Sequence, residues 1–421
     1  MQVYLVGGAV RDRLLGHPVR ERDWVVVGAD PADLITRGFT PVGREFPVFL
    51  HPETHEEYAL ARLERKVAPG YRGFETRFAP DVTLQEDLRR RDLTINAIAE
   101  SDSGEIVDPF GGRRDLEARV LRHVSEAFVE DPVRILRVAR FAARFAPLGF
   151  RVAEDTMALM ARMVSCGEVD ALVPERLWQE TERALAEERP EVFFEVLRAC
   201  GALKALYPEI DALFGVPQPE KWHPEIDTGV HVMLAVGFAA RSGASTAVRF
   251  ATLTHDLGKA LTPPERWPAH LGHEKAGVPL VETLSRRLKA PNAYQELAVL
   301  AARHHTLVHR AFELKPATVL ELLEMTDALR RPERFGELLL ACEADARGRK
   351  GLEARPYSQA DYLRQAREVA SSMALSNEER HGLEGPAIGA KIREKRLAAL
   401  AHLKREHAAQ QHAAQSEVRK S

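Results

Sequence analysis

The chain has 421 residues, 45% of them hydrophobic, and a formal net charge of −3 at pH 7. This length can bury a large core and predicts two or more domains. The near-neutral charge gives no sign of a uniformly basic nucleic-acid-binding protein, and without an apolar run of about 18 residues the sequence predicts neither a membrane span nor a signal peptide. The cysteines, Cys166, Cys200 and Cys342, lack the spacing of a disulfide framework or a zinc knuckle, which favours the reducing cytoplasm.

The first predicted strand and helix meet at a pair of glycines. Residues 2–6 alternate like a short strand, and residues 9–15 fit a helix. Gly7 and Gly8 lie between them, where glycine lets the backbone approach a phosphate and the helix start offers unpaired N–H groups. Arg11 faces the same place. The pattern is typical either of an ordinary turn or of a nucleotide-binding loop.

Two acids lie just beyond this loop. Residues 23–27 form the second predicted strand, and because residues two apart on a strand point to one face, Glu21 and Asp23 can converge. Alone, such a pair is most often a solvated strand edge. Beside a phosphate-binding loop it fits Mg²⁺-dependent phosphoryl transfer, because the metal must bridge protein and triphosphate oxygens.

Up to about Gly112 the remaining pattern predicts strands and short helices. A helix opens at residues 30–31, residues 46–50 and 57–63 form a hairpin, and residues 106–107 form a strand. Thr83 to Glu86 form a capping box that starts a helix carrying Arg91 and its neighbours. Arginines crowd the stretch from residue 89 to 144, as expected for a phosphate-rich partner or for a solvated surface.

Beyond residue 115 the pattern is helical almost to the end. Helices with an apolar stripe are predicted at 116–121, 132–145, 154–164, 174–186 and 190–199. The proline-rich loop 215–219 is taken as a domain boundary, and a further helical segment begins near residue 228. Residues 406–421 are predicted to be frayed or disordered.

One of these helices carries arginines at helical spacing. Asp131 and Pro132 form a helix start, and the arginines then recur within an arc of roughly 120°, giving one buried side and one stripe of cations. The alternative is a surface helix with exposed arginines. Arginine suits phosphate oxygens and base edges, and Asp131 with Arg134 offers both acceptors and donors for a Watson–Crick edge. The arginines are Arg134, Arg137, Arg140 and Arg144.

A histidine-rich segment follows the predicted boundary. Imidazoles and carboxylates together suit divalent metals that activate water, although the cluster could also be a folded but inactive module. The acid Asp345 is an alternative to Asp327 as the last ligand. The candidate set is His231, His255, Asp256 and Asp327, joined by His273, His304 and His305.

In combination, these motifs resemble those of the bacterial class II tRNA nucleotidyltransferases, the CCA-adding enzymes, in the long form with an HD domain. The resemblance runs over nearly the whole chain and rests on residues 7–12, 21–24, 86–96 and 130–141. It implies an α+β protein: an amino-terminal nucleotidyltransferase head of the polymerase-β-like kind, with a mixed sheet and helices, followed by an all-α body containing the HD domain.

The resemblance also implies domain ranges. They are 1–140 for the head, 141–215 for a helical nucleotide- and tRNA-binding region, 228–329 for the HD phosphohydrolase domain, 330–405 for a helical tail region, and 406–421 for a disordered end.

In the head, the resemblance implies that Glu21 and Asp23 hold Mg²⁺ and that Asp131 and Arg134 select C or A. The family commonly has aspartate where Glu21 stands, and Glu57 is a candidate third carboxylate. The residues implied to bind the incoming ATP or CTP are Gly8, Arg11, Arg91, Arg137 and Arg140.

The resemblance implies addition of CCA to tRNA from CTP and ATP, with pyrophosphate released. For the HD domain it implies 2′,3′-cyclic phosphodiesterase, 2′-nucleotidase and phosphatase activities that depend on Mg²⁺ or Ni²⁺, with His255 and Asp256 as the central ligands. Poly(A) polymerase remains an alternative. A second alternative is an RNA-binding HD phosphohydrolase with an inactive transferase half, because Glu21 stands where the family commonly has aspartate. We expect a cytoplasmic protein, either a monomer or a homodimer.

Overall fold

The computed structural model describes residues 1–19, 21–42, 48–66 and 74–418. The chain forms two compact units, Met1–Pro208 and Glu209–Ser421. The proline-rich loop 215–219 therefore lies inside the second unit, and the division that we expected after residue 140 falls within one continuous helix, α5 (Val133–Phe145).

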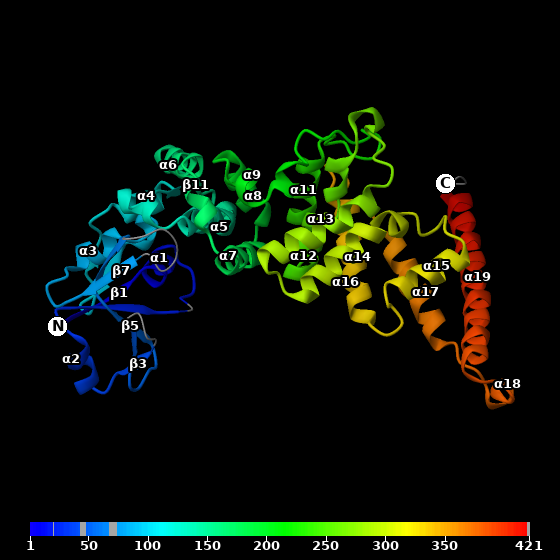
Figure 1. Cartoon of the computed structure of the whole chain (residues 1–421), viewed down its shortest axis with the longest axis horizontal. Helices are drawn as coiled ribbons and strands as arrows, with labels where there is room; N and C mark the ends of the chain where they lie inside the picture. Colours follow the sequence, from blue (N-terminus) through cyan, green and yellow to red (C-terminus); the bar gives the residue numbers. More distant parts are fainter. Residues whose placement is uncertain (20, 43–47, 67–73, 419–421) are drawn as a thin grey trace. The chain divides into compact units, whose positions relative to one another are not determined.

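Among the described residues, a seven-stranded mixed sheet forms the centre of the first unit (Figure 1). Its order is β3-β4-β5-β2-β1-β8-β9, in which β2 and β5 are parallel and the other neighbours antiparallel. The strands are β1 (Gln2–Val6), β2 (Asp23–Val27), β3 (Thr40–Val42), β4 (Val48–Leu50), β5 (Glu57–Leu60), β8 (Ala99–Ser101) and β9 (Ile106–Val107). Small two-stranded sheets pair β6 (Arg62–Lys66) with β7 (Phe74–Phe78) and β10 (Val120–Leu121) with β11 (Arg151–Val152).

Both faces of β2 are covered, because alternate side chains of a strand point to opposite faces. Val25 packs in a cluster with Leu88 of α3, whereas Val26 packs in a separate cluster with Leu34 of α2. This packing fixes β2 at the centre of the sheet and with it the position of Asp23, its first residue. Residues 46 and 47, the start of the predicted hairpin, lie outside the described residues, but β4 and β5 pair as expected.

The helices of the first unit follow the predicted pattern with one exception. The predicted helix 116–121 is wrong: α4 ends at Glu117, and Val120–Leu121 instead pairs with β11. Val120 and Leu121 have a parallel strand to pair with, and this pairing outweighs the helical spacing of the apolar residues in the sequence. The helices are α1 (Gly8–Leu14), α2 (Pro31–Thr36), α3 (Leu84–Arg89), α4 (Gly112–Glu117), α5, α6 (Glu154–Ser165), α7 (Pro174–Ala186), α8 (Pro190–Ala199) and α9 (Ala202–Leu206).

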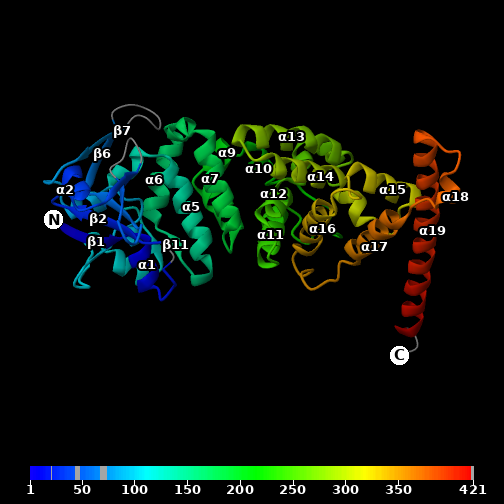
Figure 2. The same ribbon diagram turned by 90° about the horizontal axis from the view of Figure 1, so that it is seen from below.

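The second unit is helical throughout its described residues. Helices α11, α12, α13, α14 and α16 pack together, and α13 and α14 lie side by side (Figure 2), while α19 packs on α15 and α17. The bounds are α10 (Pro208–Asp211), α11 (Thr228–Arg241), α12 (Thr246–Thr254), α13 (His273–Leu288), α14 (Asn292–His309), α15 (Pro316–Met325), α16 (Pro332–Arg347), α17 (Ser358–Ser372), α18 (Asn377–Arg380) and α19 (Gly385–Val418).

The carboxyl-terminal helix corrects a further expectation. We expected residues 406–421 to be frayed, but α19 continues to Val418. Its alanines and glutamines favour a helix without burial. The α+β head followed by an all-α body is confirmed.

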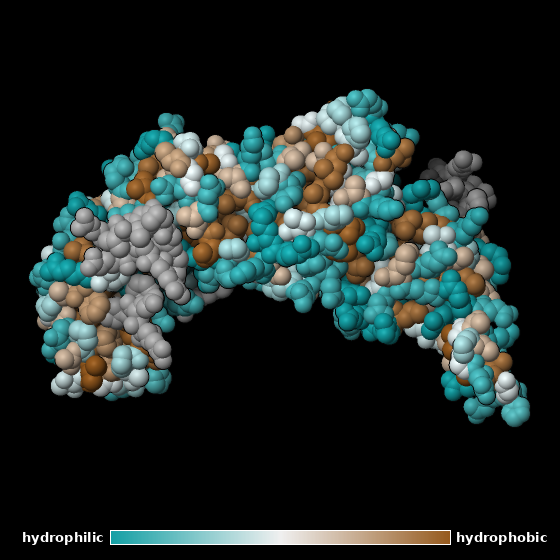
Figure 3. Space-filling view, in the orientation of Figure 1, coloured by the Kyte–Doolittle hydropathy of each residue, from teal (hydrophilic) through white to brown (hydrophobic). Residues whose placement is uncertain are grey.

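The surface of the second unit carries exposed apolar groups above α11 (Figure 3). None of the described helices is both long and apolar enough to cross a membrane. Cys166, Cys200 and Cys342 are free thiols, as their spacing predicted.

Candidate active sites

The loop between β1 and α1 lies against two arginines. Gly7 has a φ of +69°, and a Cβ there would lie 2.7 Å from Nη1 of Arg91. A Cβ on Gly8 would lie 3.4 Å from Nη2 of Arg11. Glycine is therefore required at the first position by both the backbone angle and the space. Two guanidinium groups beside a glycine loop form a site suited to an anion.

The predicted metal-binding acids lie next to this loop. Asp23 pairs across the sheet with Val6, the last residue before the glycines, and on its other side is in register with Glu57 of β5. Residues in register on neighbouring strands share a face. Loss of solvation raises the pKa of Asp23, Arg91 opposes this and Glu21 adds to it. Asp23 is thus coupled to Glu21 and has Glu57 beside it.

Arg11 is buried within a hydrogen-bonded network below the loop. Its Nε donates to Oδ1 of Asp12 at 2.8 Å, and its Nη1 donates to Oδ1 of Asn96 at 2.6 Å. Asn96 in turn donates to Asp92 at 2.9 Å, and Arg137 donates to the other oxygen of Asp92 at 2.7 Å. Burial alone would raise the pKa of Asp92, but Arg137 and Asn96 outweigh burial and hold that pKa well below its ordinary value.

The predicted base-selecting residues have other partners. Arg134 donates to the backbone carbonyls of Ala127 at 2.6 Å and Arg90 at 2.7 Å. Asp131 accepts two hydrogen bonds from Arg176 of α7, at 3.1 and 2.7 Å. The structure therefore does not pair Asp131 with Arg134, and each of them is held by other partners.

Of the four arginines in the predicted cationic stripe on α5, two are buried, Arg137 is partly buried and Arg144 is exposed. Arg134 and Arg140 are buried, and Nε of Arg140 donates to Glu180 of α7 at 2.7 Å. Arg144 lies over the ring of Phe145. The expectation of one buried side and one cationic side is corrected, because carboxylates on α7 and in the head neutralise the arginines.

Among the described residues of the second unit, histidines and acids converge in two adjacent groups within the helices, and a third group, His223, Glu225 and His231, shares His231 with the first of them. The first group combines α11, the end of α12 and α16, and the second combines the start of α13 with α14 and Asp256. Within each group the candidate ligand atoms lie within 4.8 Å of one another. The groups are His231, His255 and Asp345, and Asp256, His273 and His305.

The two groups lie next to one another. Nε2 of His255 lies 3.1 Å from Asp256 and 3.6 Å from Asp345. Nε2 of His305 lies 3.1 Å from Nε2 of His273, and 3.5 Å from Asp256. Asp256 therefore connects the two sets of ligands.

Hydrogen bonds to the backbone fix how three of the rings point. Nδ1 of His255 lies 2.7 Å from the carbonyl oxygen of Thr252. Nδ1 of His273 lies 2.9 Å from the carbonyl oxygen of His270, and Nδ1 of His305 lies 3.0 Å from that of Ala301. A carbonyl can only accept, so each Nδ1 carries a proton and each Nε2 points into the cluster. Such second contacts are typical of metal-binding histidines.

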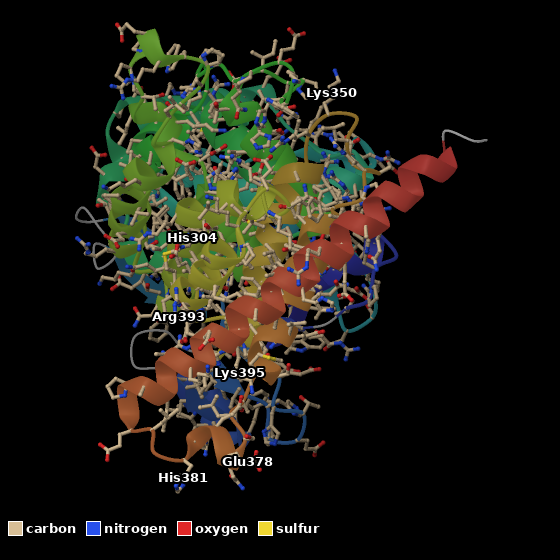
Figure 4. All side chains as sticks on the ribbon, turned by 90° about the vertical axis from the view of Figure 1, so that its right-hand side faces the viewer. His304, Lys350, Glu378, His381, Arg393 and Lys395 are labelled. Atoms are coloured by element: carbon tan, nitrogen blue, oxygen red, sulfur yellow. The ribbon has the colours of Figure 1, made fainter. Side chains whose placement is uncertain are left out.

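The last acid of the cluster is Asp345 rather than Asp327. Asp345 lies 3.0 Å from His231, whereas Asp327 pairs with Arg330 at 2.6 Å. The expectation for Asp327 is corrected because it lies in a turn after α15, outside the cluster. His304 is also outside both groups: it is buried in the middle of α14 (Figure 4), and burial lowers its pKa to about 4.

The cluster fits a bound cation. Nε2 of His255 and both oxygens of Asp256 are buried and make no hydrogen bond with suitable geometry among the described residues. Burial alone would raise the pKa of Asp256, but His255 and Lys259 hold it well below its ordinary value, so the acid is ionised. Burial lowers the pKa of His305 well below its ordinary value, which keeps that imidazole neutral. An ionised carboxylate beside imidazole nitrogens offers the donors that a divalent metal takes, and the metal would compete for Asp256 with Lys259, whose Nζ lies 2.6 Å from Oδ2 of Asp256.

Sequence reasoning missed several residues of these sites. Arg176 and Glu180 hold α5 from a separate helix, and no motif links them to it. Oε1 of Glu225 lies 2.9 Å from Nδ1 of His231. Nε2 of His309 lies 2.5 Å from Oδ2 of Asp345. Of these residues, only His309 had a sequence signal: it lies one helical turn after His305, so both side chains are expected on the same face of the helix.

Family models match three segments of the chain. Residues 3–122 match the poly A polymerase head domain, residues 149–214 match a probable RNA- and SrmB-binding site of polymerase A, and residues 228–364 match the HD domain. The fold and the two clusters of functional residues thus define a nucleotidyltransferase that carries an HD domain.

Relatives identify the family. The chain is 64% identical over 96% of its length to a multifunctional CCA protein from Thioalkalivibrio sulfidiphilus, covering 99% of that protein, and 63% identical to one from Methylococcus capsulatus, covering 95% of it. The chain belongs to the family of multifunctional CCA proteins.

Solved structures share the fold. A tRNA-processing enzyme is 25% identical with a TM-score of 0.58, over 95% of this chain and 93% of that one. A CCA-adding enzyme of Thermotoga maritima, complexed with tRNA, is 20% identical with a TM-score of 0.61, over 97% and 91% of the two chains.

Proposed function

We propose that this protein adds CCA to the 3′ end of tRNA, using CTP and ATP and no nucleic-acid template. The observation that carries the proposal is the register that places Asp23 beside the glycine loop, coupled to Glu21 and Arg91. The names of its close relatives support the same substrate and product.

In the proposed reaction the 3′ hydroxyl of tRNA attacks the α-phosphorus of the incoming nucleotide, the bond to the β-phosphate oxygen breaks, and pyrophosphate leaves. Glu21 and Asp23 would hold Mg²⁺, with Glu57 as a third carboxylate. When bound, Mg²⁺ supplies positive charge at the oxygens of the transferring phosphoryl group. Gly8 leaves space for the triphosphate, and Arg91 carries a guanidinium to the same loop.

Asp131 and Arg134 select the base in this proposal, while Arg11, Arg137 and Arg140 support the nucleotide site. A Watson–Crick edge presents both donors and acceptors, so a carboxylate and a guanidinium together can read it. Arg176 holds Asp131 in place in the structure.

For the histidine cluster we propose metal-dependent hydrolysis of 2′,3′-cyclic phosphates, 2′-nucleotides and phosphomonoesters. His231, His255, Asp256 and Asp345 would hold Mg²⁺ or Ni²⁺, which supplies an activated water when bound. His273 and His305 bring two further ring nitrogens, enough for a second ion next to the first.

The test of CCA addition is incubation of purified protein with Mg²⁺ and a tRNA lacking its terminal CCA. Supplied with CTP and ATP, the protein should add the three nucleotides and stop. A poly(A) polymerase would instead extend the RNA with ATP alone, and an inactive transferase half would extend nothing. Sizing the purified protein by light scattering decides between monomer and homodimer, and cell fractionation tests the predicted cytoplasmic location.

A further inference from the structure

The loop ahead of α11 brings an exposed tryptophan to the edge of the histidine cluster. Trp222 is 54% exposed, an unusual position for so large an apolar ring. The next residue, His223, lies with its ring centroid 4.7 Å from that of His231. The tryptophan is therefore adjacent to a residue that packs on a candidate ligand.

A second connection ties the backbone of this tryptophan to the cluster. Arg349 donates to the carbonyl of Trp222 at 3.1 Å and to the carboxylate of Asp345 at 3.0 Å. His223 lies 3.3 Å from Glu225, which also contacts His231. The loop is thus fixed to the cluster from two sides.

A lysine lies over the ring, and a second lysine and an apolar side chain are exposed in the two loops that Arg349 connects. Nζ of Lys221 lies 4.7 Å from the centroid of the Trp222 ring, and exposed Lys350 projects from the loop after α16 toward solvent (Figure 4). Ile226, in the same loop as the tryptophan, is 44% exposed. Positive charge around an exposed aromatic ring suits a ligand that has both a phosphate and a flat ring.

We propose that Trp222 is a stacking platform for the nucleobase of the substrate hydrolysed at the histidine cluster. This rests on the proposed hydrolysis of ribonucleoside 2′,3′-cyclic phosphates and 2′-phosphates. In such substrates the base is attached to the carbon next to the one that carries the 2′ oxygen. A phosphate held at the cluster therefore places the base over residues that border the cluster, and aromatic side chains stack on bases of any sequence.

The platform predicts a preference for substrates that contain a base. The wild-type protein, loaded with Mg²⁺ or Ni²⁺, should show a KM for adenosine 2′,3′-cyclic phosphate about tenfold lower than for methyl riboside 2′,3′-cyclic phosphate, which lacks a base. Trp222→Ala should remove this preference by raising only the first KM, with kcat little changed. Trp222→Phe should keep most of it.

Met325→Ala is the matched control, because Met325 is also 54% exposed in the second unit but lies at the end of α15. It should change neither KM. An unchanged KM for the adenosine substrate in Trp222→Ala, or an equal rise for both substrates, would overturn the platform.

Binding separates this inference from the proposed hydrolysis. Calorimetry with adenosine 2′-phosphate should show about tenfold weaker binding to Trp222→Ala than to the wild type. If the wild type hydrolyses neither substrate but its binding depends on Trp222, the hydrolase proposal fails and the platform stands. Hydrolysis of both substrates with equal KM values in the wild type would leave the hydrolase and reject the platform.

Discussion

The buried arginines of the head donate to acceptors within the protein, whereas the histidine cluster directs ring nitrogens and carboxylate oxygens from several helices to a shared region. In the head, Arg11, Arg134 and Arg140 each donate to an acceptor within the protein. In the cluster, Asp256 and His255 keep buried atoms that make no hydrogen bond among the described residues.

This difference indicates how each site would accept its ligand. The cluster is already arranged for a cation, because ring orientation is fixed by backbone carbonyls and little has to move. In the base-reading part of the head, Asp131 is held by an ion pair with Arg176, and Arg134 by two backbone carbonyls. Selectivity there would come from Asp131 and Arg134 reading the base edge together, with Arg176 only holding Asp131 in place.

The largest effect is expected for a mutation in the head that removes nucleotide addition and leaves hydrolysis at the histidine cluster unchanged. Asp23→Ala should lower nucleotide addition to truncated tRNA by about a thousandfold or more, because the metal loses a carboxylate ligand. Hydrolysis at the histidine cluster should stay at the wild-type rate, since Asp23 belongs to the other unit. Addition of CTP at the normal rate would contradict the metal assignment.

The reciprocal experiment breaks the cluster. The double change of His255 and Asp256 to alanine should eliminate hydrolysis of 2′,3′-cyclic phosphates, while CCA addition persists. Chelation followed by return of Mg²⁺ or Ni²⁺ provides an independent measurement. Hydrolysis that survives chelation would show that the cluster serves only the fold.

A smaller effect is expected at the base-reading pair. Alanine at Asp131 or Arg134 should reduce discrimination between CTP and UTP by about 1 to 3 kcal/mol for each lost bidentate contact. Arg176→Ala is the matched control: it frees Asp131 without removing it, so discrimination should be retained. Competition assays with mixed triphosphates measure the ratio, and a uniform loss of affinity for all triphosphates would indicate phosphate contacts instead.

The strands β1 and β2, the glycine turn between β1 and α1, and most helices followed from the sequence, because alternation, caps and helical spacing are local signals, whereas the pairing of Asp23 with Val6 and Glu57 did not. The ion pairs of α5 did not follow. Arg134, Arg140 and Arg144 have the spacing of a cationic surface, yet their acceptors come from α7, the head and the backbone, which only tertiary packing brings close. Asp345 was weighed as a ligand from the sequence, but choosing it over Asp327 needed the contact with His231.

The pH dependence of the free energy of unfolding tests the ion pair between Asp92 and Arg137 in the head. The pKa of Asp92 is lowered in the folded protein, so its contribution is present above its unfolded pKa of about 4 and is lost as the pH falls through the folded value. Asp92→Asn should cost about 2 kcal/mol at pH 7, less than a fully buried pair, because the Arg137 side chain is 35% exposed. Denaturant unfolding from pH 7 to pH 3 should show a flatter acid limb in the variant, and parallel curves would exclude this role.

The smallest effect is expected for Glu21→Asp, which restores the acid common at this position in the family. Glu21 is exposed just before β2, and its charge already reaches Asp23. Shortening the side chain by one methylene keeps a carboxylate at this position, so addition of CTP and ATP should stay within about threefold of the wild type, a change of about 0.7 kcal/mol in the barrier. Glu21→Gln keeps the length but removes the charge, and should lose far more activity. Equal rates for the two variants would show that position 21 holds no metal, leaving Asp23 and Glu57 as the carboxylates of the site.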